Sequence, residues 1–168
     1  IINLTLTDRD YTSGRSSNFI KNKNGKLSQT RLLDVDNNYI STLSLNLTQG
    51  ENFTESSSTN QSIIINEKLL SFLGFKEDAI GQIVDVDGQD YRITGVVKDF
   101  HYDSMKEEIQ PLMLLPRTEE IKRGKFIFIK YNPAQLSQLI PFIQNTWKKI
   151  TPDKELDFHF WDEQLNQR

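Results

Sequence analysis

The sequence predicts an α+β fold in which short strands, paired mainly in antiparallel hairpins, are combined with a few helices. Three observations lead to this fold class. Short runs of alternating apolar and polar residues recur along the chain, as they do in half-buried strands. Two such runs flank Asp87 and Gly88, a dipeptide typical of hairpin turns. Apolar residues within 136–150 recur at helical spacing.

Composition limits the class of protein. With 168 residues, 36% of them hydrophobic, the chain can form one sizeable core or two small ones. The net charge of -3 argues against a nucleic-acid partner, because phosphate binding requires a concentrated basic face. The basic cluster of Lys21, Lys23 and Lys26 is predicted to be a solvated loop. Since the sequence has no cysteine, disulfides and thiolate sites are excluded.

The sequence also bears on membranes and chain length. Its longest hydrophobic runs, such as 126–129, have four residues, whereas crossing a bilayer takes about 20. The chain begins at Ile1 with no initiator Met and no signal-type segment. We therefore expect a fragment of a longer protein.

The first part of the chain predicts a strand followed by a long polar segment. Residues 2–7 alternate as in a half-buried strand. Residues 8–30 are mostly polar, so we expect an exposed excursion, in which Asn24 and Gly25 suit the turn of a short hairpin.

The next segment predicts a strand, a short helix and a loop. Residues 31–35 return as a strand, and Asn37 is a suitable N-cap for a short helix that contains Tyr39. The Ser- and Thr-rich residues 55–62 are too polar to be buried and predict a surface loop.

The middle of the chain carries the clearest local signals. Residues 63–65 form a buried type of strand, Asn66 is a good N-cap, and a short apolar-faced helix should end at Gly74. A hairpin is expected over 83–97. Within its second strand, Gly95 indicates a bulge or a close approach of another backbone segment.

The C-terminal third predicts two strands, at 112–115 and 126–131, and then a helix capped by Asn132. Pro141 should kink or split this helix. Alternation over 156–160 predicts a last strand, after which a helix begins.

One constellation has the residue types of a metal or acid/base site. Asp99, His101 and Asp103 alternate, so an extended backbone would direct all three side chains to one face. The alternative is a strand that runs out into a polar turn, with Asp103 capping the next helical turn. Asp85, Asp87 and Asp90 lack the bidentate Glu that closes a calcium loop, and they are more typical of turns. The sequence has no phosphate-binding glycine motif.

A series of short motifs in a fixed order carries a resemblance to a known family. The motifs supply the residues of a structural signature: Asp36, Tyr39, Gly50, Phe53, Asn66, Glu67, Gly81, Gly95, Asp99, Phe100, His101 and Pro111. Together they resemble the extracytoplasmic domain of FtsX-like ABC transporter permeases of the MacB periplasmic core type, most like those of Bacteroidetes. Residues 160–165 are similar to the family segment that leads into the second transmembrane helix.

The resemblance implies a fold and a role. It implies one periplasmic domain over 1–168, built of a porter-like subdomain (1–35 plus 111–168) and an inserted β-rich subdomain (36–110), with the first strand and helix of the family fold missing. The domain would lie between the first and second transmembrane helices, at the periplasmic face of the bacterial inner membrane. A second permease copy and a cytoplasmic ATP-binding subunit would be its partners.

In this family the periplasmic part moves when ATP is hydrolysed, which is called mechanotransmission, and contact with cargo or a partner protein for export or efflux is a further expectation. The resemblance implies no active site and no cofactor. It interprets Asp99 and Asp103 as turn and cap residues and Phe100 as an anchor between subdomains. Two other hypotheses remain: a stand-alone secreted binding module, and a metal-dependent hydrolase built on Asp99, His101 and Asp103.

Overall fold

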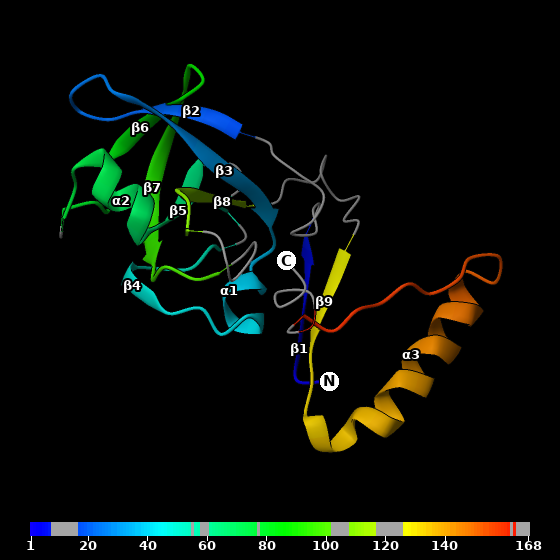
Figure 1. Ribbon diagram of the computed structural model, residues 1–168. Coiled ribbons are helices and arrows are strands. Elements are labelled where there is room, and N and C mark those ends of the chain that lie inside the picture. Colours follow the sequence, from blue (N-terminus) through cyan, green and yellow to red (C-terminus); the bar gives the residue numbers. More distant parts are fainter. Residues whose placement is uncertain are drawn as a thin grey trace.

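The structure is a computed structural model of the chain, and it describes residues 1–7, 17–54, 56–57, 61–76, 78–101, 108–116, 126–161 and 163 (Figure 1). The strands are β1 (Asn3–Thr7), β2 (Ser17–Lys21), β3 (Leu27–Val35), β4 (Leu47–Gly50), β5 (Ser62–Asn66), β6 (Ile83–Val86), β7 (Gln89–Val97), β8 (Leu112–Pro116) and β9 (Phe126–Lys130). The helices are α1 (Tyr39–Thr42), α2 (Glu67–Leu73) and α3 (Leu136–Ile150), and a 3-10 turn, η2 (Pro133–Gln135), precedes α3.

Six strands close into a ring. They are hydrogen-bonded in the order β2-β6-β7-β5-β8-β3, and β2 also pairs with β3. The β3–β8 and β5–β7 pairs are parallel, whereas β2–β3, β2–β6, β5–β8 and β6–β7 are antiparallel. The α+β fold with a mixed, mainly antiparallel sheet is therefore confirmed. The predicted division into two subdomains stays a prediction; the ring takes strands from both predicted parts.

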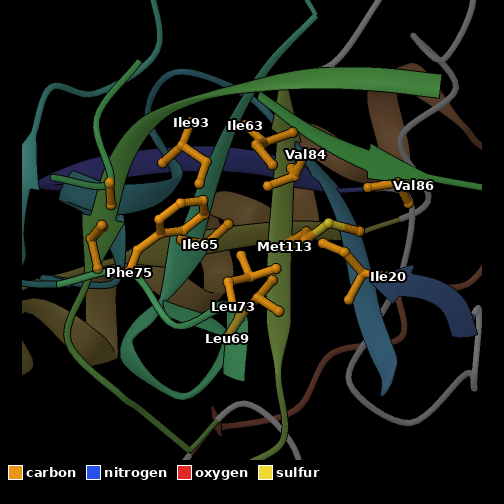
Figure 2. Packing of buried hydrophobic residues seen from close by; sticks show 12 residues of the cluster. Ile20, Ile63, Ile65, Leu69, Leu73, Phe75, Val84, Val86, Ile93 and Met113 are labelled. Carbon is orange, nitrogen blue, oxygen red and sulfur yellow. The ribbon is translucent and has the colours of Figure 1, made fainter. Parts of the chain in front are cut away.

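A first hydrophobic cluster fills the inside of the ring. Figure 2 shows Ile20 of β2, Ile65 of β5 and Met113 of β8 pointing toward one another, with Leu69 and Leu73 of α2 close by. All five side chains are almost completely buried. Side chains from several strands of the ring form this cluster, so it stabilises the ring as one unit. Each buried aliphatic side chain contributes about 1.5–3 kcal/mol to the free energy of folding.

A second cluster lies on the other side of β5 and β8, where α1 covers the sheet. Tyr39 and Ile40 of α1 pack there with Phe53, Ile64 and Leu114. β5 is buried along its whole length, which explains why its sequence contains a continuous run of three isoleucines instead of alternating apolar and polar residues.

β1, β9, η2 and α3 form a small lobe, whereas β4 pairs with β7 of the ring. β1 pairs with β9 over five residues but joins the ring only through the pair Thr7 and Val35 of β3. α3 stands away from the ring in Figure 1, and Leu139 is its one buried residue in the described part of the chain. Phe128 of β9 contacts Trp161 edge-on, with ring centroids 5.3 Å apart, so both ends of the described chain lie on this lobe.

Several local predictions are confirmed. The Asn66 side chain accepts a hydrogen bond from the Leu69 amide at 3.0 Å and so caps α2, which ends at Gly74 with a φ of 79°. Asp87 and Gly88 have φ values of 53° and 86° and turn the β6–β7 hairpin. Two positive φ angles match the twist of the flanking strands.

Other predictions are wrong. Of the exposed excursion predicted at 8–30, residues 8–16 lie outside the described part. The short hairpin predicted at Asn24 and Gly25 is confirmed as β2–β3, but the excursion is not exposed throughout, because Ile20 is completely buried. Its burial comes from pairing with β6, far along the chain, which no local pattern reveals. The polar loop predicted at 55–62 contains two buried serines, Ser57 and Ser62, and β5 begins at the second of them; residues 55 and 58–60 lie outside the described part.

Two predictions about helices and one about a strand differ from the structure. Asn38, not Asn37, occupies the N-cap position of α1 and makes no side-chain cap; the Asn38 amide donates to Asp36 instead. Of the kink or split predicted at Pro141, the split is wrong, since α3 continues through this residue; the kink stays a prediction. Residues 156–160 form no strand; Phe160 instead contacts the ring of Tyr131, the residue that follows β9. The short strand β4 was not expected.

Candidate functional site: two polar junctions

The Asp36 carboxylate joins the lobe to the ring. It follows β3, and its Oδ1 accepts hydrogen bonds from the Thr5 hydroxyl at 2.5 Å and the Asn38 amide at 2.9 Å. Its Oδ2 accepts from the Leu6 amide at 2.8 Å. One side chain therefore binds β1 and the start of α1 together. Hydrogen bonds to an ionised carboxylate are stronger than neutral ones, about 1.5–3 kcal/mol each.

Side chains of the lobe make further bonds to α1. The Asn3 amide donates to the Ser41 hydroxyl at 2.8 Å, and the Lys130 ammonium donates to the Ser41 carbonyl at 3.4 Å and to the Ser44 hydroxyl. These groups are exposed. Among the described residues, the lobe is attached by the strand pair of β1 with β3, by packing of β1 and β9 against α1, and by the hydrogen bonds of Asp36 and the exposed side chains.

A second junction centres on Asn66, which is completely buried at the end of β5. Its Oδ1 accepts from the amides of Leu69 at 3.0 Å and Leu112 at 2.9 Å, and its Nδ2 donates to the Gln110 carbonyl at 3.0 Å. The cap of α2 therefore also fixes the start of β8. A buried amide with three partners leaves no uncompensated polar group of its own.

Asp99 and Glu67 extend this junction. The Asp99 carboxylate accepts from the Lys68 amide at 2.9 Å, and the Asp99 amide donates to the Glu67 carboxylate at 3.3 Å. The Lys68 ammonium pairs with Glu108 at 2.5 Å. That hydrogen bond and charge raise the pKa of Lys68 and lower the pKa of Glu108 from their ordinary values. The end of β7 and residue 108 are therefore both attached to the first turn of α2.

Two glycines of the signature allow close backbone contact. A Cβ on Gly50 would lie 2.1 Å from the Thr94 carbonyl oxygen, and its φ of +70° also favours glycine. A Cβ on Gly95 would lie 2.8 Å from the Glu51 carbonyl oxygen. The β5–β7 register shifts next to Gly95, so the predicted bulge and close approach are both present.

The other signature residues serve packing and backbone pairing. Tyr39 and Phe53 are buried in the second cluster, and Phe100 packs against it. The Pro111 carbonyl accepts from the Arg31 amide at 2.8 Å and the Thr30 hydroxyl at 3.1 Å. The Gly81 amide donates to the Ile93 carbonyl at 2.8 Å.

Of the three metal candidates, the structure describes Asp99 and His101 only, so the predicted convergence with Asp103 stays a hypothesis. Asp99 is bound to α2, His101 is half-buried, and Asp103 lies outside the described part. Within the described ranges, no group of three His, Cys, Asp or Glu side chains has the arrangement of a metal site.

The sequence did not predict most hydrogen-bond partners of Asp36 and Asn66, the central residues of the two junctions. Thr5 lies 31 residues from Asp36, and Leu112 lies 46 residues from Asn66. Asp36 and Asn66 share one sequence signal: each is a polar residue directly after an apolar run.

Residues 7–140 match the family of MacB-like periplasmic core domains. The chain belongs to this family. It is therefore a domain on the periplasmic or extracellular side of a MacB-type ABC transporter permease. A comparison with curated proteins found no significant match.

Solved structures agree with the family in fold. The periplasmic region of MacB from Actinobacillus actinomycetemcomitans is 16% identical with a TM-score of 0.63, and the match covers 88% of this chain and 66% of that one. The extracellular domain of YknZ, a noncanonic ABC-type transporter from Gram-positive bacteria, is 16% identical with a TM-score of 0.62 over 91% and 78% of the chains.

A domain of a putative permease from Porphyromonas gingivalis is 17% identical, with a TM-score of 0.59 over 98% of this chain and 82% of that one. The specific resemblance to Bacteroidetes permeases stays a prediction. Within the described residues, no helix has the length and hydropathy that membrane crossing requires.

Proposed function

We propose that this domain is a non-catalytic relay: it transmits the ATP-driven movement of the permease's transmembrane helices to the six-stranded ring. In this proposal the domain lies between the first and second transmembrane helices and acts in a dimer of permease copies served by a cytoplasmic ATP-binding subunit. The ring would present the displaced surface to cargo or to a partner protein.

The contrast between ring and lobe attachment supports the proposal most directly. The ring has a closed hydrogen-bond path around a buried cluster. The lobe, on which both ends of the described chain lie, contacts the ring side through the Thr7–Val35 pair, the bonds around Asp36, and packing of β1 and β9 on α1. In this proposal, a movement of the transmembrane helices first displaces the lobe. Because the lobe has fewer attachments than the strands of the ring have to one another, the lobe and the ring can rotate relative to each other about a hinge.

The test is a distance measurement in the whole permease with its ATP-binding subunit. Spin labels are placed at Ile150→Cys on α3 and Ile83→Cys on β6, both exposed, after any cysteines in the remainder of the permease and in its ATP-binding subunit are replaced. The relay predicts that pulsed electron paramagnetic resonance shows a different distance distribution in nucleotide-free and ATP-trapped protein. A control pair on the ring side, Leu27→Cys in β3 and Ile80→Cys just before β6, should keep its distance. An unchanged lobe-to-ring distance would refute the relay.

A further inference from the structure

Three exposed apolar side chains lie on neighbouring strands of the ring. They are Phe19 of β2, Leu27 of β3 and Ile83 of β6, with exposed fractions of 52%, 53% and 48%. β2 lies between the other two strands, since it pairs with β3 over five residues and with β6 at Ile20. Exposed apolar groups that lie near one another among polar residues mark interaction sites on proteins.

Strand alternation places these side chains on the outer face of the ring. On β2, Ile20 is buried in the first cluster, and its neighbours Phe19 and Lys21 are exposed. Lys21 lies opposite Leu27 of β3. On β6, exposed and buried residues alternate from Ile83 onward. Successive side chains of a strand point to opposite faces, so the exposed ones share the face that points away from the cluster.

This surface is also basic. Residues 17–30 contain Lys21, Lys23 and Lys26 but no Asp or Glu, although the net charge of the chain is -3. All three lysines are exposed, and none of them forms an ion pair with another described residue. The Lys23 ammonium lies over the Phe75 ring, 4.2 Å from the ring centroid. The surface therefore combines exposed apolar groups with positive charge.

Two aspartates near this surface are bound to backbone amides instead of lysines. The Asp85 carboxylate accepts a hydrogen bond from the Gly88 amide at 3.2 Å, and the Asp87 carboxylate accepts one from the Phe19 amide at 3.3 Å. These bonds hold the β6–β7 turn and attach it to β2. Within the described part of the chain, the lysines are thus available to carboxylates of another molecule.

The turn of the β2–β3 hairpin is ordered by its own side chains. The Asn22 Oδ1 accepts from the amides of Asn24 at 3.0 Å and Lys26 at 2.9 Å, and the Asn22 Nδ2 donates to the Phe72 carbonyl at 3.4 Å. The last of these bonds attaches the turn to α2. A surface that is already ordered loses little conformational entropy on binding.

The surface lies at the end of β3 that is remote from the lobe. β3 runs from Leu27 to Val35, where it pairs with Thr7 of β1. A strand of this length spans about 26 Å. Figure 1 shows β2 and β6 on the side of the ring away from β1 and β9. The lobe therefore leaves this surface accessible.

We propose that the outer face of β2, β3 and β6 binds an acidic segment of another protein. Carboxylates of the segment would pair with the lysines of the hairpin, and its apolar side chains would contact Phe19, Leu27 and Ile83. Opposite charge directs the encounter, and apolar contact supplies most of the affinity. This inference rests on the proposed function, in which the ring presents a surface to a partner, and adds the chemistry of that partner.

The first experiment is an NMR titration of the 168-residue chain, labelled with ¹⁵N. The probe is a helical peptide of about 18 residues, or five turns, with Leu along one face and Glu along the other. Amide signals of β2, β3 and β6 should shift, with a dissociation constant of about 10–500 µM for a small interface. A peptide with Gln in place of every Glu should bind about tenfold or more weakly, because it lacks the charge.

The second experiment compares two variants of the chain. Lys21→Glu should weaken peptide binding by about tenfold or more, since it places a like charge at the centre of the surface. Lys98→Glu is the matched control, because it makes the same change of net charge at an exposed position. Lys98 lies six residues beyond Arg92, the partner of Ile83 on β7, so this variant should bind the peptide as the unchanged chain does.

Three results would overturn the proposal: no shift at about 1 mM peptide, equal binding of the Gln peptide, or an equal loss in both variants. Preferential binding to phosphatidylglycerol vesicles would also overturn it, in favour of a membrane surface. The titration involves neither ATP nor the transmembrane helices. Its failure therefore leaves the relay intact, and unchanged spin-label distances in the permease would leave the binding surface intact.

Discussion

Replacing Asn66 by Ala is the sharpest test of the buried junction. The substitution removes the cap of α2 and the acceptor for the Leu112 amide. Loss of an Asn cap costs about 1 kcal/mol, and a buried amide without a partner costs about 1–3 kcal/mol. Gln110 is an exposed residue, so we expect its carbonyl to bind water in the variant. We therefore expect a loss of about 2–4 kcal/mol from the free energy of unfolding.

Urea denaturation of the purified chain, followed by circular dichroism, measures this loss. For a slope of about 2 kcal/mol/M, the midpoint should fall by about 1–2 M. Asn132→Ala is the matched control, since Asn132 is also an N-cap, accepting from the Ala134 amide at 3.1 Å, but is exposed. Its midpoint should fall by less than about 0.5 M. Equal shifts for the two variants would show that burial and the second amide add nothing at Asn66.

The remaining predictions concern three other contacts. Gly95→Ala should lower the free energy of unfolding by about 1–3 kcal/mol, because its Cβ would lie 2.8 Å from the Glu51 carbonyl; an unchanged melting temperature would contradict this. Asp36→Ala should speed hydrogen exchange of the Leu6 amide by about tenfold or more and leave ring amides unchanged, as measured by NMR. The Lys68–Glu108 pair should stabilise the fold between about pH 5 and pH 10. The lowered pKa of Glu108 makes its contribution disappear as pH falls through that pKa, and the raised pKa of Lys68 makes its contribution disappear as pH rises through that one. NMR titration of Glu108 in Lys68→Met should show a return of its pKa to the ordinary value, and salt should have the same effect in the unchanged chain.

Short-range patterns were sufficient for part of the fold. The α2 unit could be predicted because a buried strand, Asn66 and Gly74 follow one another directly. The β6–β7 hairpin could be predicted because Asp87 and Gly88 suit a turn that requires positive φ. In both cases the physical cause lies within a few residues of the signal.

Long-range pairing accounts for what was missed. β2 has few apolar residues, and its burial depends on Val86, the partner of Ile20. β4 has four residues and pairs across a bulge with β7, so it shows little periodicity. Closure of the ring likewise depends on pairs distant in sequence, which composition and spacing do not specify.

The two junctions should have separable effects if the relay proposal is right. The ring can transmit a displacement only while its core stays packed, and Asn66 is buried in that core. Asp36 lies between the ring and the lobe, so its loss should loosen transmission without unfolding the ring. In the whole permease, Asp36→Ala should therefore reduce the ATP-dependent change in the lobe-to-ring distance at nearly unchanged ring stability. Asn66→Ala should lower stability first. If both variants lost stability and transmission in the same proportion, the connection would be part of the core and not a hinge.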